Sequence, residues 1–98
     1  MSPNSTYGTP MNALSQTVAY TGTAAPSTAM PSNVQCIRVV ATTDCFINIS
    51  VAGTAALVAS SMFISGNSVG EYFGCPPLGI VSVIQSSAGG NLYITPFA

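Results

Sequence analysis

Ionised side chains are almost missing from this chain, and that scarcity limits both its fold and its function. Its 98 residues include one basic residue, Arg38, and two acidic residues, Asp44 and Glu71, with no lysine or histidine. Charged residues make up 3% of the chain, against roughly 25% in a typical soluble domain. The hydrophobic content of 48% and the net charge of -1 are the reverse of a disordered composition. We therefore expect an ordered protein whose copies repel each other little and which functions inside an assembly.

The same scarcity removes the side chains that most catalytic sites use. Glycoside hydrolysis needs two carboxylates, and of the two present Asp44 lies in an expected turn. A serine or cysteine nucleophile normally needs an adjacent base, and the chain has neither histidine nor lysine. One arginine cannot neutralise a phosphate backbone, and the pair Gly89 and Gly90 lies between predicted strands, unlike a phosphate-binding loop. We expect no enzyme activity, no cofactor and no binding of nucleic acid.

Three cysteines, Cys36, Cys45 and Cys75, have no close spacing and no histidine with which to form a metal site. Free cysteine is among the most buried residue types, which favours three small buried apolar side chains. One disulfide with a thiol left over is the alternative. Residues 1–12 contain no basic residue and no apolar run follows them, so we expect no secretory signal and synthesis in the reducing cytoplasm.

Residues 46–64 are uncharged and long enough to cross a bilayer as a helix. Asn48, Gly53, the β-branched content of residues 46–51 and the lack of flanking basic residues argue against a membrane span. We therefore expect no membrane association.

The first third of the chain differs in texture from the rest. Residues 1–33 are rich in Ser, Thr, Asn, Ala and Pro, and alternation of apolar and polar residues occurs only over residues 14–20. Residues 21–32 read as a loop because they hold one glycine and two prolines. We predict an extended N-terminal arm over residues 1–33 that contains one strand.

Residues 34–98 carry a continuous β pattern and form the predicted core. The runs 34–41 and 45–51 are separated by three residues, which is the spacing of a β-hairpin. A register that pairs Ala41 with Cys45, Val39 with Ile47 and Ile37 with Ile49 keeps one face apolar. That register leaves Cys36, Val40 and Phe46 on the outer face, where another segment or subunit must cover them.

The remaining elements are short. A strand is favoured over a helical turn for residues 54–64, a turn follows at 65–70, and residues 71–75 form a strand suited to a sheet edge, since two prolines end it. Residues 80–85 and 92–95 are predicted to form a second hairpin, which sets Val81 and Val83 beside Leu92 and Ile94. Six to seven short strands spaced by about ten residues predict a small antiparallel β-sandwich or barrel.

Three segments carry a resemblance to known proteins: IRVVATTDCFI at 37–47, EYF at 71–73 and VIQSSAGGNLYIT at 83–95. Over residues 34–95 the chain resembles small capsid decoration (cement) proteins of tailed bacteriophages. The resemblance implies a virion protein on the capsid surface that contacts the major capsid protein and carries no catalytic residues. It also implies a homo-oligomer, since a trimer fits the threefold positions of an icosahedral shell.

Two groups of residues are expected to make the contacts with partners. The arm would lie across a neighbouring subunit and add main-chain hydrogen bonds at a sheet edge; its expected anchors are Tyr7, Met11, Leu14 and Tyr20. The second group is the apolar outer face of the first predicted hairpin, with Cys36, Val40 and Phe46. The alternative is a neck, tail or fibre component whose β-sandwich binds a ligand or glycan by stacking on tyrosines.

Overall fold

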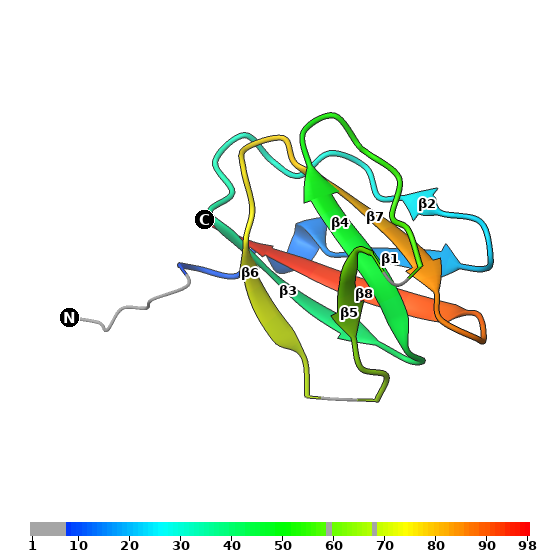
Figure 1. The fold of residues 1–98 in the computed structure, drawn as a ribbon. Coiled ribbons are helices and arrows are strands. Elements are labelled where there is room, and N and C mark those ends of the chain that lie inside the picture. The colour runs from blue at the N-terminus through cyan, green and yellow to red at the C-terminus, as the bar shows by residue number, and fades with distance from the viewer. Residues whose placement is uncertain (1–7, 59, 68) are drawn as a thin grey trace.

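Eight strands of the described residues form two antiparallel sheets that pack face to face in the computed structural model (Figure 1). The structure describes residues 8–58, 60–67 and 69–98. The strands are β1 (Gln16–Tyr20), β2 (Ala25–Pro26), β3 (Cys36–Ala41), β4 (Cys45–Ser50), β5 (Met62–Ile64), β6 (Glu71–Gly74), β7 (Ile80–Gln85) and β8 (Gly90–Phe97), and one 3-10 turn, η1, spans Asn12–Leu14. The first sheet has the order β1-β8-β3-β6 and the second has the order β2-β7-β4-β5. The predicted small antiparallel β fold is confirmed and is a sandwich, with one strand more than the six to seven expected because β2 lies within the predicted loop at residues 21–32.

Alternation along the strands determines which residues form the core. In β3, Ile37, Val39 and Ala41 are fully buried, and in β4 so are Cys45 and Ile47. The other strands contribute the buried residues Val18, Tyr20, Ile64, Val81, Val83, Leu92 and Ile94. Each fully buried Val, Leu or Ile side chain stabilises the fold by about 1.5–3 kcal/mol relative to exposure.

The predicted hairpin of residues 34–41 with residues 45–51 is wrong. β3 pairs with β6 and β8, whereas β4 pairs with β5 and β7, so the chain crosses from one sheet to the other between them. Ile37 lies opposite Phe73 and Pro96, and Ile49 lies opposite Val81. Both inner faces of a sandwich are apolar, so alternation cannot distinguish a hairpin from two strands that face each other across the core.

Side-chain hydrogen bonds hold this crossing in place. The Tyr20 hydroxyl donates to the Thr43 carbonyl oxygen at 2.6 Å, and the Thr43 N–H donates to the Tyr20 oxygen at 3.1 Å. The Gly66 N–H donates to Oδ1 of Asp44 at 2.8 Å. A Cβ at Gly90 would lie 2.5 Å from the hydroxyl oxygens of both threonines of the crossing, Thr42 and Thr43, so only glycine fits there.

The predicted second hairpin is wrong for the same reason. β7 pairs with β2 and β4, and β8 pairs with β1 and β3, so these two strands also belong to different sheets. Val81 and Val83 do meet the core together with Leu92 and Ile94, but from opposite sides of it.

The strand expected within residues 14–20 is confirmed as β1, and it belongs to the sandwich. It pairs with β8 along its whole length, from Gln16 opposite Ile94 to Tyr20 opposite Gly90. Upstream, the Met11 N–H donates to the Pro96 carbonyl oxygen at 2.8 Å. Residues 9–20 therefore follow β8 instead of extending away from the body of the protein.

Residues 54–64 form much less strand than expected. Only Met62–Ile64 is a strand. Residues 54–56 lie over the outer face of the second sheet, where Thr54 and Ala56 bond to the side chains of Asn48 in β4 and Ser82 in β7. Ala56 of this segment is buried, and its N–H donates to the Ser82 hydroxyl oxygen at 3.0 Å. In contrast, the predicted edge strand over residues 71–75 is confirmed, since β6 (Glu71–Gly74) is at the edge of the first sheet.

Candidate interaction surfaces

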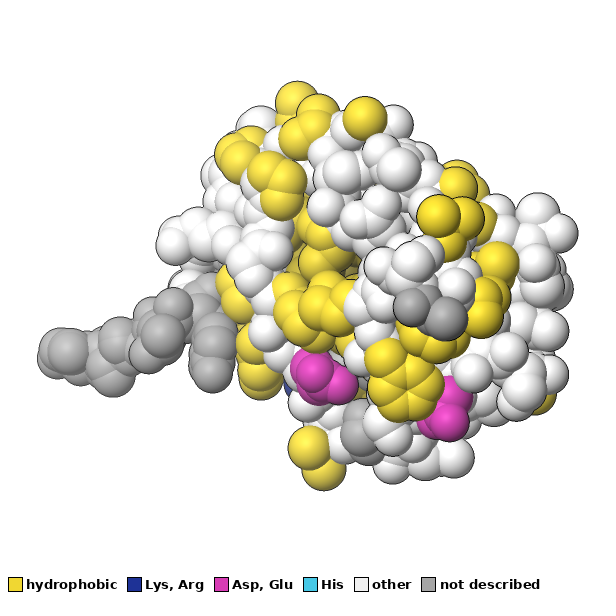
Figure 2. Space-filling model, viewed as in Figure 1, with side chains coloured by type: hydrophobic (Ala, Val, Ile, Leu, Met, Phe, Trp, Pro, Cys, Tyr) yellow, Lys and Arg dark blue, Asp and Glu magenta, His cyan; other side chains and the backbone are white. Residues whose placement is uncertain are grey.

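The outer face of the second sheet carries a row of apolar side chains. The register places Phe46 of β4 between Phe63 of β5 and Ile84 of β7. The two phenyl rings pack edge to face with their centroids 5.4 Å apart, and Phe63 remains 50% exposed. Figure 2 shows hydrophobic side chains gathered on this side of the molecule, with the acidic side chains toward its lower border. The row is an uncharged surface on which another apolar surface can pack.

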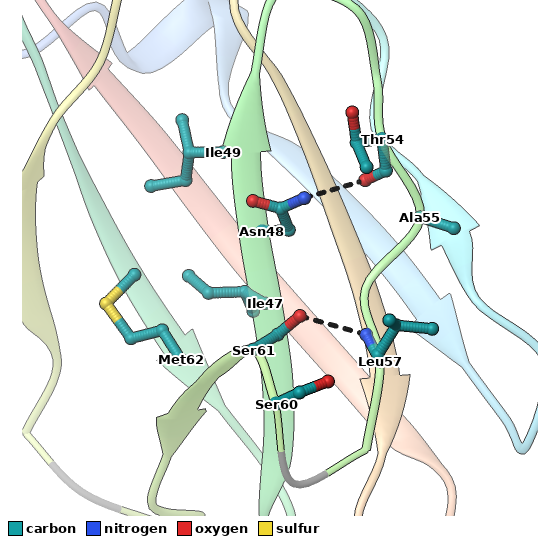
Figure 3. Close-up of a pocket in the computed structure, with 9 residues that line it drawn as sticks. All are labelled: Ile47, Asn48, Ile49, Thr54, Ala55, Leu57, Ser60, Ser61 and Met62. Carbon is teal, nitrogen blue, oxygen red and sulfur yellow. Dashed lines mark hydrogen bonds between the residues drawn. The ribbon is translucent and has the colours of Figure 1, made fainter.

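A groove of about 550 Å³ runs beside β4 on the same sheet (Figure 3). It is lined by Ile47, Asn48, Ile49, Thr54, Ala55, Leu57, Ser60, Ser61 and Met62, none of which is charged. The Asn48 side-chain amide donates to the Thr54 carbonyl oxygen at 3.2 Å, and the Leu57 N–H donates to the Ser61 hydroxyl oxygen at 2.9 Å. The groove is therefore apolar along one side and lined by hydroxyl and amide groups along the other.

The outer face of the first sheet combines tyrosines with the single arginine. Tyr72 and Tyr93 are 41% and 46% exposed, and Arg38 and Val40 of β3 lie between them in the register. The guanidinium Nη2 of Arg38 donates to the Val69 carbonyl oxygen at 2.6 Å. Tyrosine and arginine are among the residue types that contribute most binding free energy at the centres of protein interfaces.

Glycine is required where this arginine meets the chain before β6. Gly70 has a φ of 100°, a conformation that L side chains rarely adopt. A Cβ at this position would lie 3.0 Å from the guanidinium carbon of Arg38 and from Cγ2 of Val40. The absence of a Cβ at Gly70 thus leaves room for the side chains of Arg38 and Val40.

The three residues expected on one outer face do not lie together. Cys36 and Val40 belong to β3 in the first sheet, and Phe46 belongs to β4 in the second. Cys36 is buried at 8% exposure, while Val40 and Phe46 are partly buried. The expectation of a single patch is wrong because the hairpin on which it depended does not form.

The expected anchors of the N-terminal arm lie in different environments. Tyr20 is 1% exposed and belongs to the core of the protein itself, so it is not available to a partner. Met11 is partly buried against the same core, and Leu14 is 50% exposed. Tyr7 lies outside the described residues. Alternation over residues 14–20 identified one face of a strand correctly, but it contains no information on which body that face packs against.

The three thiols are free and buried, as the favoured interpretation of their sequence pattern predicted. Burial raises the pKa of Cys36, and burial and then the neighbouring Cys36 raise the pKa of Cys75. Burial raises the pKa of Cys45 to about 11, with the Tyr20 hydrogen bond acting in the opposite direction and the charge of Asp44 adding to the rise. The thiols are therefore protonated at neutral pH and are poor nucleophiles.

The sequence reasoning missed Phe63 and the groove next to it. A usable signal was present in Met62, Phe63 and Ile64, which are three consecutive apolar residues in a strand. Successive side chains of a strand point to opposite faces, so such a run must place an apolar side chain on the outer face. The groove itself has no sequence signal, because it depends on where β5 stops pairing with β4.

Within the described ranges, no three His, Cys, Asp or Glu side chains gather as a potential metal site. None of the described helical segments has the length and apolar character needed to cross a bilayer. Comparison of the chain with protein-family models, curated proteins and solved structures gives no match.

Proposed function

We propose that the protein is a structural virion component that binds the outer surface of a bacteriophage capsid and stabilises the shell. In this role it contacts the major capsid protein and other copies of itself. The observation that carries the proposal is the pairing of an almost uncharged chain with large apolar side chains exposed on a folded sandwich, among them Phe63, Leu57 and Leu78. Such a surface gains free energy by contact and offers little for chemistry.

The physical argument concerns the kind of contact that a shell requires. Burial of apolar area contributes about 25 cal/mol per Å² and does not depend on ion pairs. Exposed ion pairs contribute roughly 0–1 kcal/mol and are screened by salt. A protein whose contacts avoid charge would hold a shell together over a wide range of ionic strength, and many copies would multiply a small gain per contact.

Self-association follows from the same surface. Copies with a net charge of -1 repel each other weakly, and closed cyclic symmetry is the common arrangement of homo-oligomers. A trimer would match the threefold positions of a shell. A stable monomer at micromolar concentration in sedimentation velocity would count against this part of the proposal.

Shell binding tests the proposal directly. Purified shells are mixed with the protein at 50 and 500 mM NaCl, and the bound copies are counted by quantitative gel analysis. We expect saturable binding whose affinity changes less than about twofold between the two salt concentrations, since exposed charge pairs contribute little. Absence of binding, or loss of binding at high salt, would overturn the proposal.

The role of the N-terminal segment requires a shorter deletion than the sequence alone suggests. Removal of residues 2–20 would delete β1 and expose the core, because β1 pairs with β8. Removal of residues 2–7 leaves every described strand intact and tests whether the segment contributes to shell binding. We expect the shorter deletion to weaken shell binding while the unfolding transition is unchanged; full occupancy by this variant would remove the segment from the contact.

One observation favours a second candidate, a neck, tail or fibre component that binds a glycan. Tyr72 and Tyr93 are both substantially exposed on the same face of the first sheet, with Arg38 between them. Aromatic rings with polar tips suit stacking against sugar rings. A glycan array read with the wild type and with Tyr93→Ala separates the candidates: glycan binding that the substitution abolishes supports the second one.

A further inference from the structure

The second sheet has an interior strand that is left open over part of its length. β4 pairs with β7 from Cys45 to Ser50, but with β5 only from Cys45 to Ile47. No strand among the described residues lies on the β5 side of Ile49. This stretch of open edge forms part of the groove in Figure 3.

The hydrogen-bond pattern shows which main-chain groups face that open edge. The Ser86 N–H donates to the Asp44 carbonyl oxygen at 3.1 Å, so residue 44 directs its carbonyl toward β7. Successive residues of a strand direct their N–H and C=O groups to alternate sides. The main-chain N–H and C=O groups of Asn48 and Ser50 therefore point toward β7, whereas those of Ile47 and Ile49 point toward the β5 side.

The partner strand gives the same answer independently. Val81 of β7 lies opposite Ile49. Its N–H donates to the Ser27 hydroxyl oxygen at 2.9 Å, and its carbonyl oxygen accepts from the Ser27 N–H at 2.8 Å, both on the side away from β4. Ile49 and Val81 are thus a pair that exchanges no main-chain hydrogen bonds, so the N–H and C=O of Ile49 face the groove.

The chain cannot close this edge by lengthening β5. Residues 60 and 61 would be the next to pair with β4, but the N–H groups of Ser60 and Ser61 both donate to the Leu57 carbonyl oxygen, at 3.3 and 3.0 Å. The Ser61 hydroxyl also accepts from the Leu57 N–H at 2.9 Å. This local turn fixes the start of β5 at Met62 and keeps the groove open.

We propose that this groove binds an extended, uncharged segment of another polypeptide, which pairs with Ile49 as an added strand. The proposal deepens the function above and rests on it, since it names how an assembly partner is held. Strand addition supplies affinity through main-chain bonds and specificity through pockets for alternate side chains. The groove volume of about 550 Å³ lies within the roughly 300–1,000 Å³ of sites that hold small ligands.

The walls of the groove indicate which segment fits. Ile47, Ile49 and Met62 project to one side of β4 in Figure 3, and Asn48 and Thr54 lie on the other. A residue opposite Ile49 would direct its side chain to the apolar side, and its two neighbours would point to the amide and hydroxyl side. The preferred segment is therefore polar, apolar, polar, and it needs no charge because none of the described lining residues is charged.

Amide exchange of the whole protein in solution tests the proposal, with Ile47 as the matched control within the same strand. In the free protein we expect fast exchange at the Ile49 amide and slow exchange at the Ile47 amide, which faces Met62. The probes are end-blocked pentapeptides of serine and threonine with Gly, Ala, Val, Leu or Phe at the centre. We expect the Val and Leu peptides at millimolar concentration to slow Ile49 exchange at least tenfold and the Gly peptide to have little effect.

Two substitutions separate the groove from the rest of the surface. Met62→Glu places a charge at the groove wall, and we expect it to weaken peptide binding at least fivefold. Val69→Glu places the same charge at a site that is 88% exposed and outside the groove, and we expect no change. Slow exchange of Ile49 in the free protein, no response to any peptide, or equal loss in both variants would overturn the proposal.

Shell binding distinguishes failure of this inference from failure of the proposed function. Wild-type shell occupancy by the Met62→Glu variant would overturn the groove as the partner site and leave the decoration function in place. Peptide binding in the groove without any shell binding would support the groove and overturn the decoration function.

Discussion

The sandwich has two edges, one formed by β1 and β2 and the other by β5 and β6, and the two edges are covered to different extents. At the β1 and β2 edge, Oε1 of Gln16 accepts from the Thr28 N–H at 2.9 Å and from the Thr28 hydroxyl at 2.8 Å, and Nε2 donates to the Thr28 carbonyl oxygen at 3.2 Å. Met30, in the segment that follows β2, is only 1% exposed. At the β5 and β6 edge, Met62 is 39% exposed and Phe73 is only partly buried against the core.

This contrast indicates which edge contributes most to the stability of the fold and which edge is free to contact a partner. A sheet edge with unpaired main-chain groups is a template for another chain, and proteins usually cover it. At the edge formed by β1 and β2, the side chain of Gln16 bonds the segment after β2 to β1, and we call this the closed edge. The edge formed by β5 and β6 is left with short strands and a groove, and we call it the open edge. We infer that the first edge holds the fold together and the second is used by a partner.

The sharpest test compares two methionines. Met30→Ala removes a fully buried side chain at the closed edge, and we expect a loss of about 2–5 kcal/mol in the free energy of unfolding. Met62→Ala removes a side chain that is already 39% exposed, and we expect a loss below about 1 kcal/mol. Urea unfolding followed by circular dichroism measures both, and equal losses would contradict the contrast between the edges.

The second test uses pH to probe the interior between the edges. Burial is the main cause that raises the pKa of Cys45 to about 11 from its ordinary value of 9.0. The folded state therefore holds this proton more tightly than the unfolded state. The protonated Cys45 thiol therefore contributes its full stabilisation below pH 9, and this contribution is lost as the pH rises through 11. The free energy of unfolding falls by at most about 2–3 kcal/mol.

Urea unfolding at pH 7.5, 9 and 10.5 measures this loss, and Cys45→Ala is the matched variant. The variant should retain only the smaller pH dependence that comes from Cys36 and Cys75, whose pKa values are also raised by burial. A pH dependence of the same size in the variant and the wild type would show that Cys45 is not its source.

The third test concerns the bond that ties the closed edge to the crossing between sheets. Tyr20→Phe removes the hydroxyl that bonds both the N–H and the C=O of Thr43, and we expect a loss of about 1–3 kcal/mol, since two main-chain groups lose their partner. Tyr93→Phe removes a hydroxyl from a side chain that is 46% exposed, and we expect a change within about 0.5 kcal/mol. If the two losses measured by urea unfolding are the same, the Tyr20 bond does not hold the crossing.

Sequence patterns predicted correctly which face of most strands points inward, but they predicted the wrong pairing partners for these strands. Val39 and Ile47 were placed on the inner face, and both are buried. Their expected pairing was wrong because period-two alternation reports the side to which a residue points, not the sheet to which its strand belongs. The short connection at residues 42–44 is compatible both with a hairpin and with a crossing between the sheets. The hydrogen bond of Tyr20 that stabilises the crossing joins residues 23 positions apart, so local sequence patterns do not reveal it.

The candidate surfaces were less predictable than the core. Phe46 and Val40 were identified as outward-facing, yet the structure places them in different sheets. Tyr20 was expected to anchor a partner and instead lies in the core. Surface assignment requires the sheet order, and the sheet order depends on long-range pairs such as β1 with β8 that leave no trace in local periodicity.

The last test uses Phe63 at the β5 and β6 edge, where we expect a small change in stability and a large change in association. Phe63→Ser removes a half-exposed ring that packs edge to face on Phe46, and such pairs contribute about 0.5–1.5 kcal/mol. We expect the free energy of unfolding to fall by about 1 kcal/mol, while the concentration at which copies associate in sedimentation velocity rises severalfold. Val69→Ser is the control, because Val69 is 88% exposed and lies away from the Phe46 row. If Phe63→Ser lowers stability without changing association, the ring serves the fold alone, and the open edge loses its role as the surface through which copies meet.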